Sequence, residues 1–272
     1  MTALKIESGT AREPATYRAA ARSTYDRIAG LYDLLDFGFE FCRYRPLRPL
    51  LFDGLSGTIL DAGVGTGRNM PFYPEGGRVV GIDVSSGMLA QARKRRGKLG
   101  KTVELLEMDV LATTFPDRHF DAIVATFLFC ALEPHQQLPA LRELARICKP
   151  GGQFRLLEYS YSKNPIRRTV MRFWVPWVRW AYGAAFDRRT ERYLAQAGLE
   201  LVEARYLYHD IIKLIVARPA GIAPESHGVL TGLDPDQGAP PATRLREENR
   251  EEAVSTPRLQ TINPTLERKE PL

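Results

Sequence analysis

Cysteine is scarce in this chain of 272 residues, and its few copies lie far apart. Only Cys42, Cys130 and Cys148 are present, and no pair has the C-x-x-C spacing of a zinc site or a redox motif. We therefore expect neither a disulfide framework nor a metal centre, as is typical of a reduced, cytoplasmic protein. Each cysteine is expected to be a small buried apolar side chain.

Long apolar runs are also missing. No stretch approaches the roughly 18 consecutive apolar residues of a membrane-spanning helix, and residues 1–14 lack the apolar core of a signal peptide. The sequence thus predicts a cytoplasmic protein that is soluble or contacts the inner face of the membrane only peripherally.

Aromatic residues are absent from residues 220–272. This segment contains seven prolines and carries nine acidic against six basic residues, whereas the whole chain has a net charge of +6. Such a composition buries too little apolar surface to offset the entropy lost on folding. We therefore predict a flexible N-terminus over 1–14, a basic folded domain over 15–219, and a disordered acidic, proline-rich tail over 220–272.

Short apolar strands alternate with helical segments in the part predicted to fold. Strands are expected around 59–60 and over 78–82, 103–108, 120–126 and 153–158, with helices within 17–41, after Ser85-Ser86 and over 135–148, the last stopped by 149–152. This alternation predicts a parallel sheet of right-handed strand–helix–strand units. Two further strands, 201–208 and 211–217, are separated only by His209 and Asp210, which predicts an antiparallel hairpin.

A glycine-rich turn follows the first strand. Asp61 is followed by Gly63, Gly65 and Gly67, and glycine lets the backbone turn sharply and a ligand approach closely. The dinucleotide fingerprint G-x-G-x-x-G would need glycine where Arg68 stands, and no Gly-Lys-Ser/Thr of a phosphate-binding loop follows. The spacing therefore argues against NAD, FAD and nucleoside triphosphates.

The turn belongs to a wider pattern of short segments. They are Tyr25-x3-Ala29-x2-Tyr32-Asp33, Gly63-Val-Gly-Thr-Gly67, Pro71-Phe-Tyr-Pro74, Gly81-Ile-Asp-Val-Ser85, Met108-Asp109, Phe115-Pro-Asp117 and Lys149-Pro-Gly-Gly152. Together they resemble the class I S-adenosylmethionine (SAM)-dependent methyltransferases, in particular the ubiquinone/menaquinone C-methyltransferase-like branch and its bacterial phosphatidylethanolamine N-methyltransferases. The resemblance implies a seven-stranded Rossmann-like sheet ending in an antiparallel hairpin, helices on both faces, and SAM as cofactor.

The resemblance also implies which residues hold SAM. In the family, the acidic residue and glycines of the turn contact the methionine end, the residue matching Asp83 accepts the ribose hydroxyls, and the one matching Asp109 binds the adenine amine. One such aspartate is more often a cap or turn residue, but three at successive strand ends favour a ligand site. The expected set is Asp61, Gly63, Gly65, Gly67, Asp83, Val84, Met88, Met108, Asp109, Val110, Thr126 and Phe127, without a metal.

The methyl acceptor leaves a weaker signal. After the fourth predicted strand the chain lacks the Asn/Asp-Pro-Pro-Tyr/Phe motif of enzymes that methylate nucleobase amines, and Cys130 has no neighbouring proline as in 5-methylcytosine formation. Nucleic acid is therefore not an expected partner. A small-molecule or lipid acceptor is, with phosphatidylethanolamine first, a quinone-ring carbon or a small thiol as alternatives, and a non-catalytic regulatory subunit as the alternative from another class.

Segment 164–192 combines all three tryptophans of the chain with several arginines. They are Trp174, Trp177, Trp180, Arg167, Arg168, Arg172 and Arg179. Tryptophan and arginine on one amphipathic segment suit the headgroup region of an anionic membrane. The alternative is a helix that packs its tryptophans on the sheet, and both hold together if the segment is the family's substrate lid.

Four residues are candidates for orienting the acceptor or taking its proton: Tyr25, Tyr32, Glu158 and His209. The tyrosines could equally be core aromatics, and a lone histidine is more often structural than catalytic.

Overall fold

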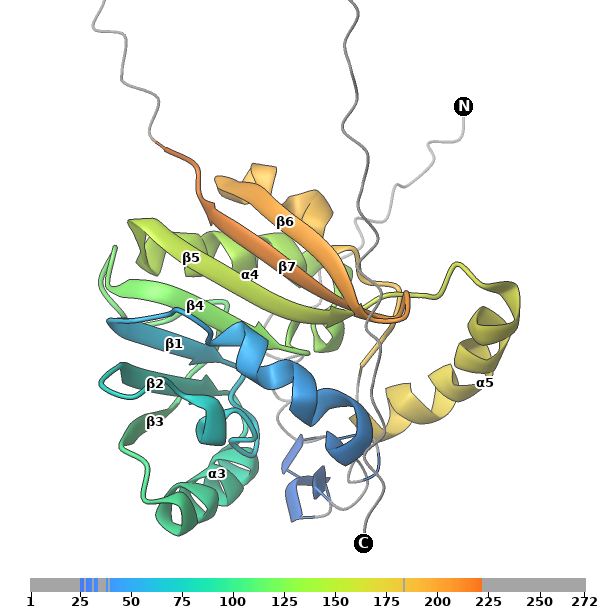
Figure 1. Cartoon of the computed structure of the whole chain (residues 1–272), viewed down its shortest axis with the longest axis horizontal. Helices are drawn as coiled ribbons and strands as arrows, with labels where there is room; N and C mark the ends of the chain where they lie inside the picture. Colours follow the sequence, from blue (N-terminus) through green and yellow to red (C-terminus); the bar gives the residue numbers. More distant parts are fainter. Residues whose placement is uncertain are drawn as a thin grey trace, which may run out of the picture. The chain divides into compact units, whose positions relative to one another are not determined.

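The computed structural model describes residues 25, 26, 28–30, 32, 33, 38, 40–182 and 184–221, without the side chains of 180–182. They form a sheet in the order β3-β2-β1-β4-β5-β7-β6 (Figure 1). Its strands are β1 (Thr58–Ala62), β2 (Arg78–Asp83), β3 (Val103–Glu107), β4 (Phe120–Thr126), β5 (Cys148–Tyr159), β6 (Leu199–Tyr208) and β7 (Ile212–Pro219). The first five are parallel, and β7 runs antiparallel between β5 and β6. The predicted parallel sheet closed by a hairpin is confirmed.

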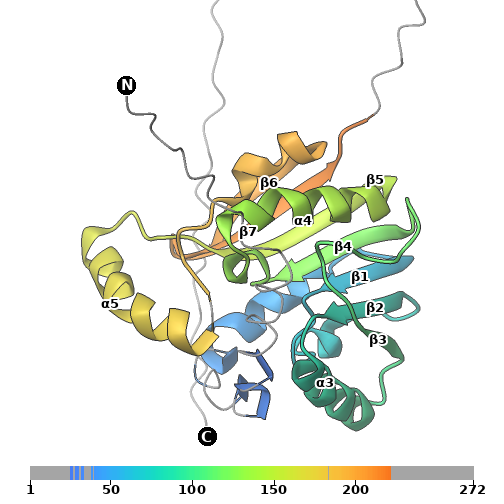
Figure 2. The same ribbon diagram turned by 180° about the vertical axis from the view of Figure 1, so that it is seen from behind.

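Both faces of the sheet are covered because its residues alternate between two apolar clusters. On β4, Ile123 packs with α4 (Pro134–Ile147), whereas its neighbour Val124 packs on the opposite face with α3 (Ser86–Leu99) and η2 (Arg45–Leu51). This alternation is the two-residue period of a strand buried on both sides. Figures 1 and 2 show α4 covering one face of the central strands. The prediction of helices on both faces is confirmed.

The remaining elements are short, apart from one helix. They are η1 (Glu40–Tyr44), η3 (Met70–Phe72), η4 (Phe129–Ala131), α5 (Pro165–Tyr182), η5 (Thr190–Tyr193) and η6 (Ala195–Ala197). Within the predicted helical segment 17–41, residues 25, 26, 28–30, 32, 33 and 38 are helical. No helix in the described part of the chain is long and apolar enough to span a bilayer.

Local sequence patterns correctly predict where several helices and strands begin or end. β4 has the predicted bounds, and the Oγ of Ser85 caps α3 by accepting a hydrogen bond from the Met88 N–H at 3.0 Å. Residues 149–152, predicted only as a helix stop, instead belong to β5, whose first residue Cys148 pairs with Phe120. A register shift between Phe120 and Ala122 accommodates them.

One cysteine differs from expectation. Cys130 and Cys148 are buried as predicted, but Cys42 is exposed, because η1 leaves that side of the helix uncovered. The predicted N-terminus 1–14 and nearly all of the predicted tail lie outside the described residues.

Candidate active site

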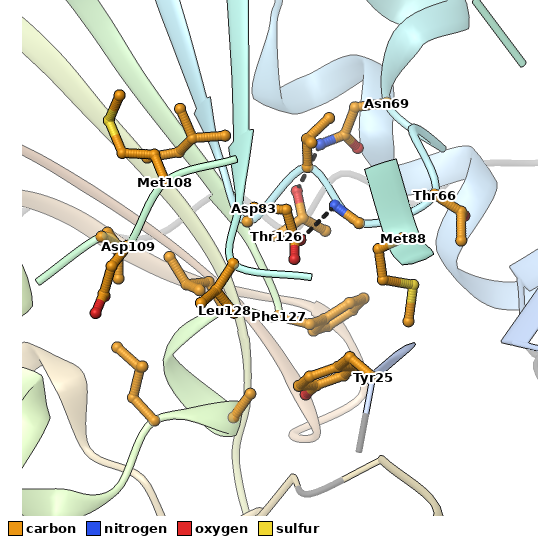
Figure 3. Close-up of a pocket in the computed structure, with 18 of the residues that line it drawn as sticks. Tyr25, Thr66, Asn69, Asp83, Met88, Met108, Asp109, Thr126, Phe127 and Leu128 are labelled. Carbon is orange, nitrogen blue, oxygen red and sulfur yellow. Dashed lines mark hydrogen bonds between the residues drawn. The ribbon is translucent and has the colours of Figure 1, made fainter. Parts of the chain in front are cut away.

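A cavity of about 160 Å³ lies at the carboxyl ends of β1 to β4. Carboxyl ends of parallel strands meet at one edge of a sheet, which brings distant residues together there. The lining contains most of the predicted cofactor residues: Gly63, Gly65, Asp83, Val84, Met88, Met108, Asp109, Val110, Thr126 and Phe127 (Figure 3). Asp61 and Gly67 were predicted with them but are not among the described lining residues.

Asp83 shapes the glycine turn from the end of β2. Its Oδ2 accepts a hydrogen bond from the Gly65 N–H at 2.9 Å, and its Oδ1 accepts one from the Ser85 N–H at 2.9 Å. Burial raises the pKa of Asp83 to about 6, against the lowering effect of these hydrogen bonds. The side chain is thus an oriented, ionised carboxylate at neutral pH.

The three glycines of the turn have different surroundings. Gly65 has φ +55° and lines the cavity, and a Cβ built on it would meet no atom within 4 Å. A Cβ on Gly67 would lie 2.5 Å from Cε of Met70, and one on Gly63 would lie 2.9 Å from Cδ1 of Leu128. Gly65 therefore leaves room for a ligand, whereas Gly63 and Gly67 permit close packing of the turn.

Asp61 lies fully buried behind the turn. Its carboxylate accepts a hydrogen bond from the Tyr73 hydroxyl at 2.6 Å and from the Asn69 amide at 3.1 Å to each oxygen. The same amide donates to Oγ1 of Thr126 at 3.0 Å. Burial raises the pKa of Asp61 to about 6, against these hydrogen bonds. Asp61 thus holds the Asn69 amide that links the turn to β4.

Two arginines connect the chain before β1 to the same turn. Arg48 donates to both carboxylate oxygens of Glu40 at 2.7 Å and to Oδ1 of Asn69 at 2.6 Å. Arg68 forms ion pairs with Glu40 and Asp33, both at 3.0 Å. No sequence pattern predicts this network, because its partners lie far apart along the chain and share no spacing.

A second cavity, of about 500 Å³, shares part of its wall with the first. Tyr25, Tyr32 and Phe127 line both cavities. α5 contributes its inner face, which includes Trp174 and Trp177. Two of the three tryptophans predicted either to pack inward or to face a membrane therefore line a cavity, and the side chain of Trp180 lies outside the described part of the chain.

Phe127 stands at the junction of the two cavities. It has a left-handed backbone, with φ +57°, which is uncommon for a residue other than glycine. Its N–H donates to the Leu157 carbonyl at 2.8 Å, and its ring stacks on Tyr159 with the centroids 4.5 Å apart. Tyr159 in turn donates a hydrogen bond to the Tyr44 hydroxyl at 2.5 Å. The shared wall is thus a fixed aromatic cluster.

The four predicted catalytic candidates do not gather at one point. Tyr25 and Tyr32 lie at the junction of the cavities, and His209 lines the second cavity alone. Glu158 is among the described lining residues of neither.

Glu158 is buried at the end of β5. Its two oxygens accept hydrogen bonds from the backbone N–H groups of Phe129 and Cys130, at 2.9 and 3.0 Å. Burial raises the pKa of Glu158 to about 8, although these bonds lower it. In this position Glu158 fixes η4, which begins just after Phe127.

The similarity to known proteins covers the strands and the turn that form the first cavity. The family model described as a methyltransferase domain matches residues 59–152, which contain all but the first residue of β1, the glycine turn of the first cavity, β2 to β4 and the start of β5. A phosphatidylethanolamine N-methyltransferase from Cereibacter sphaeroides is 34% identical over 192 residues, which cover 68% of this chain and 89% of that protein.

The chain belongs to the class I SAM-dependent methyltransferases.

A second relative and a solved structure are also similar to the methyltransferase, the latter in its fold. A demethylmenaquinone methyltransferase from Thermus thermophilus is 37% identical over 142 residues, which cover 50% of this chain and 64% of that protein. The solved geranyl diphosphate C-methyltransferase from Streptomyces coelicolor, bound to S-adenosyl-L-homocysteine, matches with a TM-score of 0.52 and 18% identity, over 65% of this chain and 77% of that one. The predicted family, fold and cofactor are thereby confirmed.

SAM is the cofactor of the methyltransferase, and the first cavity suits it. The open space beside Gly65 admits a ligand against the backbone. Asp83 presents a carboxylate where hydroxyl groups can be bound, and Figure 3 shows Met108 and Asp109 on the side of the cavity opposite Met88 and Phe127. The lining thus offers both polar acceptors and apolar side chains to a nucleoside.

Proposed function

We propose that this methyltransferase transfers a methyl group to the amine nitrogen of phosphatidylethanolamine. SAM supplies the methyl group when bound, with Asp83 accepting its ribose hydroxyls and Asp109 its adenine amine. Phe127, at the wall common to both cavities, orients the amine toward the methyl group and excludes water. The nitrogen–carbon bond forms as the carbon–sulfur bond breaks, and the amine proton passes to a base, for which Tyr25 and Tyr32 are the candidates.

The size and lining of the second cavity are the main observations that support this proposal. Its volume is about 500 Å³, and aromatic and aliphatic side chains dominate its wall. Such a lining suits a lipid. The aromatic faces of Tyr44, Phe127 and Tyr159 also favour the ammonium that N-methylation produces, through cation–π contact.

The outer face of α5 supports a lipid acceptor independently. Ile166 is 75% exposed and Phe173 is 83% exposed, which is unusual for large apolar side chains. The helix carries four arginines and no acidic residue. An amphipathic helix of this kind binds the headgroup region of an anionic bilayer. We propose that α5 makes this contact and that its inner face receives the lipid.

A quinone-ring carbon is the second candidate. The apolar cavity also accommodates a planar ring, and the Thermus thermophilus relative is named for demethylmenaquinone. A small thiol as acceptor finds less support, because it does not need so large a cavity. A non-catalytic regulatory subunit also finds less support, because it does not need an acceptor cavity beside the cofactor site.

One incubation separates these candidates. The purified protein is mixed with SAM carrying a labelled methyl group and, in parallel, with phosphatidylethanolamine in mixed micelles, a demethylated quinone and a small thiol. We expect labelled N-methylated lipid by mass analysis and far less label with Asp83→Ala at a subsaturating concentration of SAM. Label in the quinone or thiol alone would refute the proposal.

Vesicle co-sedimentation tests the membrane contact of α5. The double variant Ile166→Ala/Phe173→Ala should lose binding to anionic vesicles, because both side chains are exposed and neither lines a cavity. Leu201→Ala/Val202→Ala is the matched control, since those residues are 46% and 56% exposed on β6. Equal losses in both variants, or no binding by the native protein, would refute the contact.

A further inference from the structure

The second cavity has an uneven distribution of charge. Three basic side chains line it: Arg43 from η1, Arg167 from α5 and His209 from the turn between β6 and β7. Among its described lining residues there is no carboxylate. None of the three lines the first cavity, whereas Tyr25, Tyr32 and Phe127 line both. The basic groups therefore belong to the part of the acceptor cavity that is away from the methyl donor.

Both arginines are held by neighbouring groups. Arg167 donates from Nη1 to Oδ1 of Asp210 at 3.1 Å, and its Nε and Nη2 make no hydrogen bond among the described residues. The guanidinium carbon of Arg43 lies 5.3 Å from the centroid of the Tyr208 ring. The guanidinium of Arg167, anchored through Nη1, keeps a planar set of donors for an anion.

Asp210, the ion-pair partner of Arg167, is itself held by further hydrogen bonds. Its two oxygens also accept the Ser162 hydroxyl at 2.8 Å each and the Lys163 N–H at 2.5 Å. These bonds hold the pKa of Asp210 below its usual range, so it serves as a fixed anion that orients Arg167. The adjoining His209 is itself fixed in an unusual backbone conformation, with φ +49°.

We propose that Arg43 and Arg167, with His209 beside them, bind the phosphodiester of a phospholipid acceptor. This inference rests on the proposed function and specifies which part of the lipid each end of the cavity recognises. Arginine donors match phosphate oxygens, while the aromatic junction receives the amine and the α5 side chains receive the acyl chains. The two carbons between amine and phosphate in ethanolamine set the separation of these two subsites. A quinone or a simple thiol has no group for the arginines.

Methylation kinetics with dihexanoyl phosphatidylethanolamine below its micelle concentration test this inference. A dissolved monomer removes any contribution of a membrane surface. Arg43→Gln and Arg167→Gln should each raise KM about tenfold, with kcat within about twofold, because a charge-assisted hydrogen bond to the bound lipid is lost. Arg167→Lys, which keeps a positive charge at that position, should recover part of the KM.

Arg205→Gln is the matched control. Arg205 lies on β6, is exposed, pairs with Glu203 at 2.8 Å and lines neither cavity, so its removal should leave KM unchanged. Glycerophosphoethanolamine and inorganic phosphate, added as competitors, distinguish a headgroup from a free anion: only the former should inhibit at matched concentration.

The outcomes separate the two proposals. If the native protein does not methylate the lipid, the proposed function is refuted. If it does, but Arg43→Gln and Arg167→Gln leave KM unchanged or Arg205→Gln raises it equally, the phosphate site alone is refuted.

Discussion

The two cavities share a wall but are built in different ways. Most of the first is formed by strand ends and the loops that follow them, and it relies on backbone geometry and on carboxylates. Asp83, for example, accepts hydrogen bonds from the N–H groups of Gly65 in the glycine turn and of Ser85. The second collects bulky side chains from residues as far apart as Tyr25 and Ile212, including both η1 and α5. The first construction suits a polar ligand with hydrogen-bond donors at fixed positions, and the second suits a large apolar ligand.

This contrast explains how one fold retains its methyl donor while accepting different substrates. Backbone positions are set by the sheet itself, so the donor site is inherited with the fold. The acceptor cavity depends on side chains of elements outside the parallel strands, which can change without disturbing the sheet. Substitutions in the first cavity should therefore act on SAM affinity, and those in the second on acceptor use or local stability.

The largest expected effect is that of Asp83→Ala. Removing this carboxylate deletes its charge-assisted bonds to ligand hydroxyls and frees the Gly65 and Ser85 N–H groups. We expect SAM affinity to fall roughly 100-fold, the equivalent of about two to three kcal/mol, while the fold persists. Titration calorimetry measures the affinity, and circular dichroism checks folding. Unchanged affinity would place the donor elsewhere.

Gly65→Ala should lower SAM affinity about tenfold. The added methyl group enters the space that the cavity offers the ligand and also carries the strain of φ +55°. Gly100→Ala separates these effects, because Gly100 has φ +61°, would place its added methyl group in open space and lies at the end of α3. The control should lose similar stability in urea but no SAM affinity, and equal affinities in the two variants would contradict the assignment.

SAM affinity should depend on pH through Asp83 of the first cavity. The ionised form of Asp83 accepts hydroxyl hydrogen bonds, and its pKa is raised to about 6. Affinity is therefore full well above pH 6 and falls as the pH drops through 6, by at most about tenfold per unit for one proton. Calorimetry from pH 8 to pH 5 measures this. In Asp83→Asn the remaining affinity should vary less over the same range.

The smallest effect is expected from Tyr159→Phe. This change removes the hydroxyl that donates to Tyr44 but keeps the ring stacked on Phe127. The free energy of unfolding should fall by about 1 kcal/mol, with SAM affinity within twofold, since Tyr159 is not in the described lining of the first cavity. A large loss of SAM affinity would show that the two cavities are not independent.

The two cavities also differ in how much of each can be predicted from the sequence. β4 and the cap of α3 depend on neighbouring residues: β4 is predicted to the residue, and the cap falls within the predicted pair Ser85-Ser86. Asp83 and Asp109 are also found from the sequence, because Asp83 ends β2 and Asp109 lies two residues beyond β3, and the apolar pattern of both strands is plain. Contacts of this kind need only local patterns and the rule that ligands lie at strand ends.

Contacts between segments far apart in the sequence cannot be predicted from such local patterns. The bond from Asn69 to Asp61, and that from Arg48 to Glu40, join residues that no periodicity or motif connects. The sequence also gives no reason to expect Tyr44 beside Tyr159, which lies more than a hundred residues away. The acceptor cavity consists of such contacts, so its wall becomes visible only in the folded chain.

Phe127 belongs to both walls, and this limits how the enzyme can change its substrate. Its ring is held by the left-handed backbone and by stacking on Tyr159, so it cannot turn away from one cavity to enlarge the other. A smaller side chain here would widen the space for a bulkier acceptor. It would also remove contacts with the methyl donor and so lower the affinity for SAM. Acceptor range and donor affinity therefore change in opposite directions at this one position, and new substrates are gained more readily at α5.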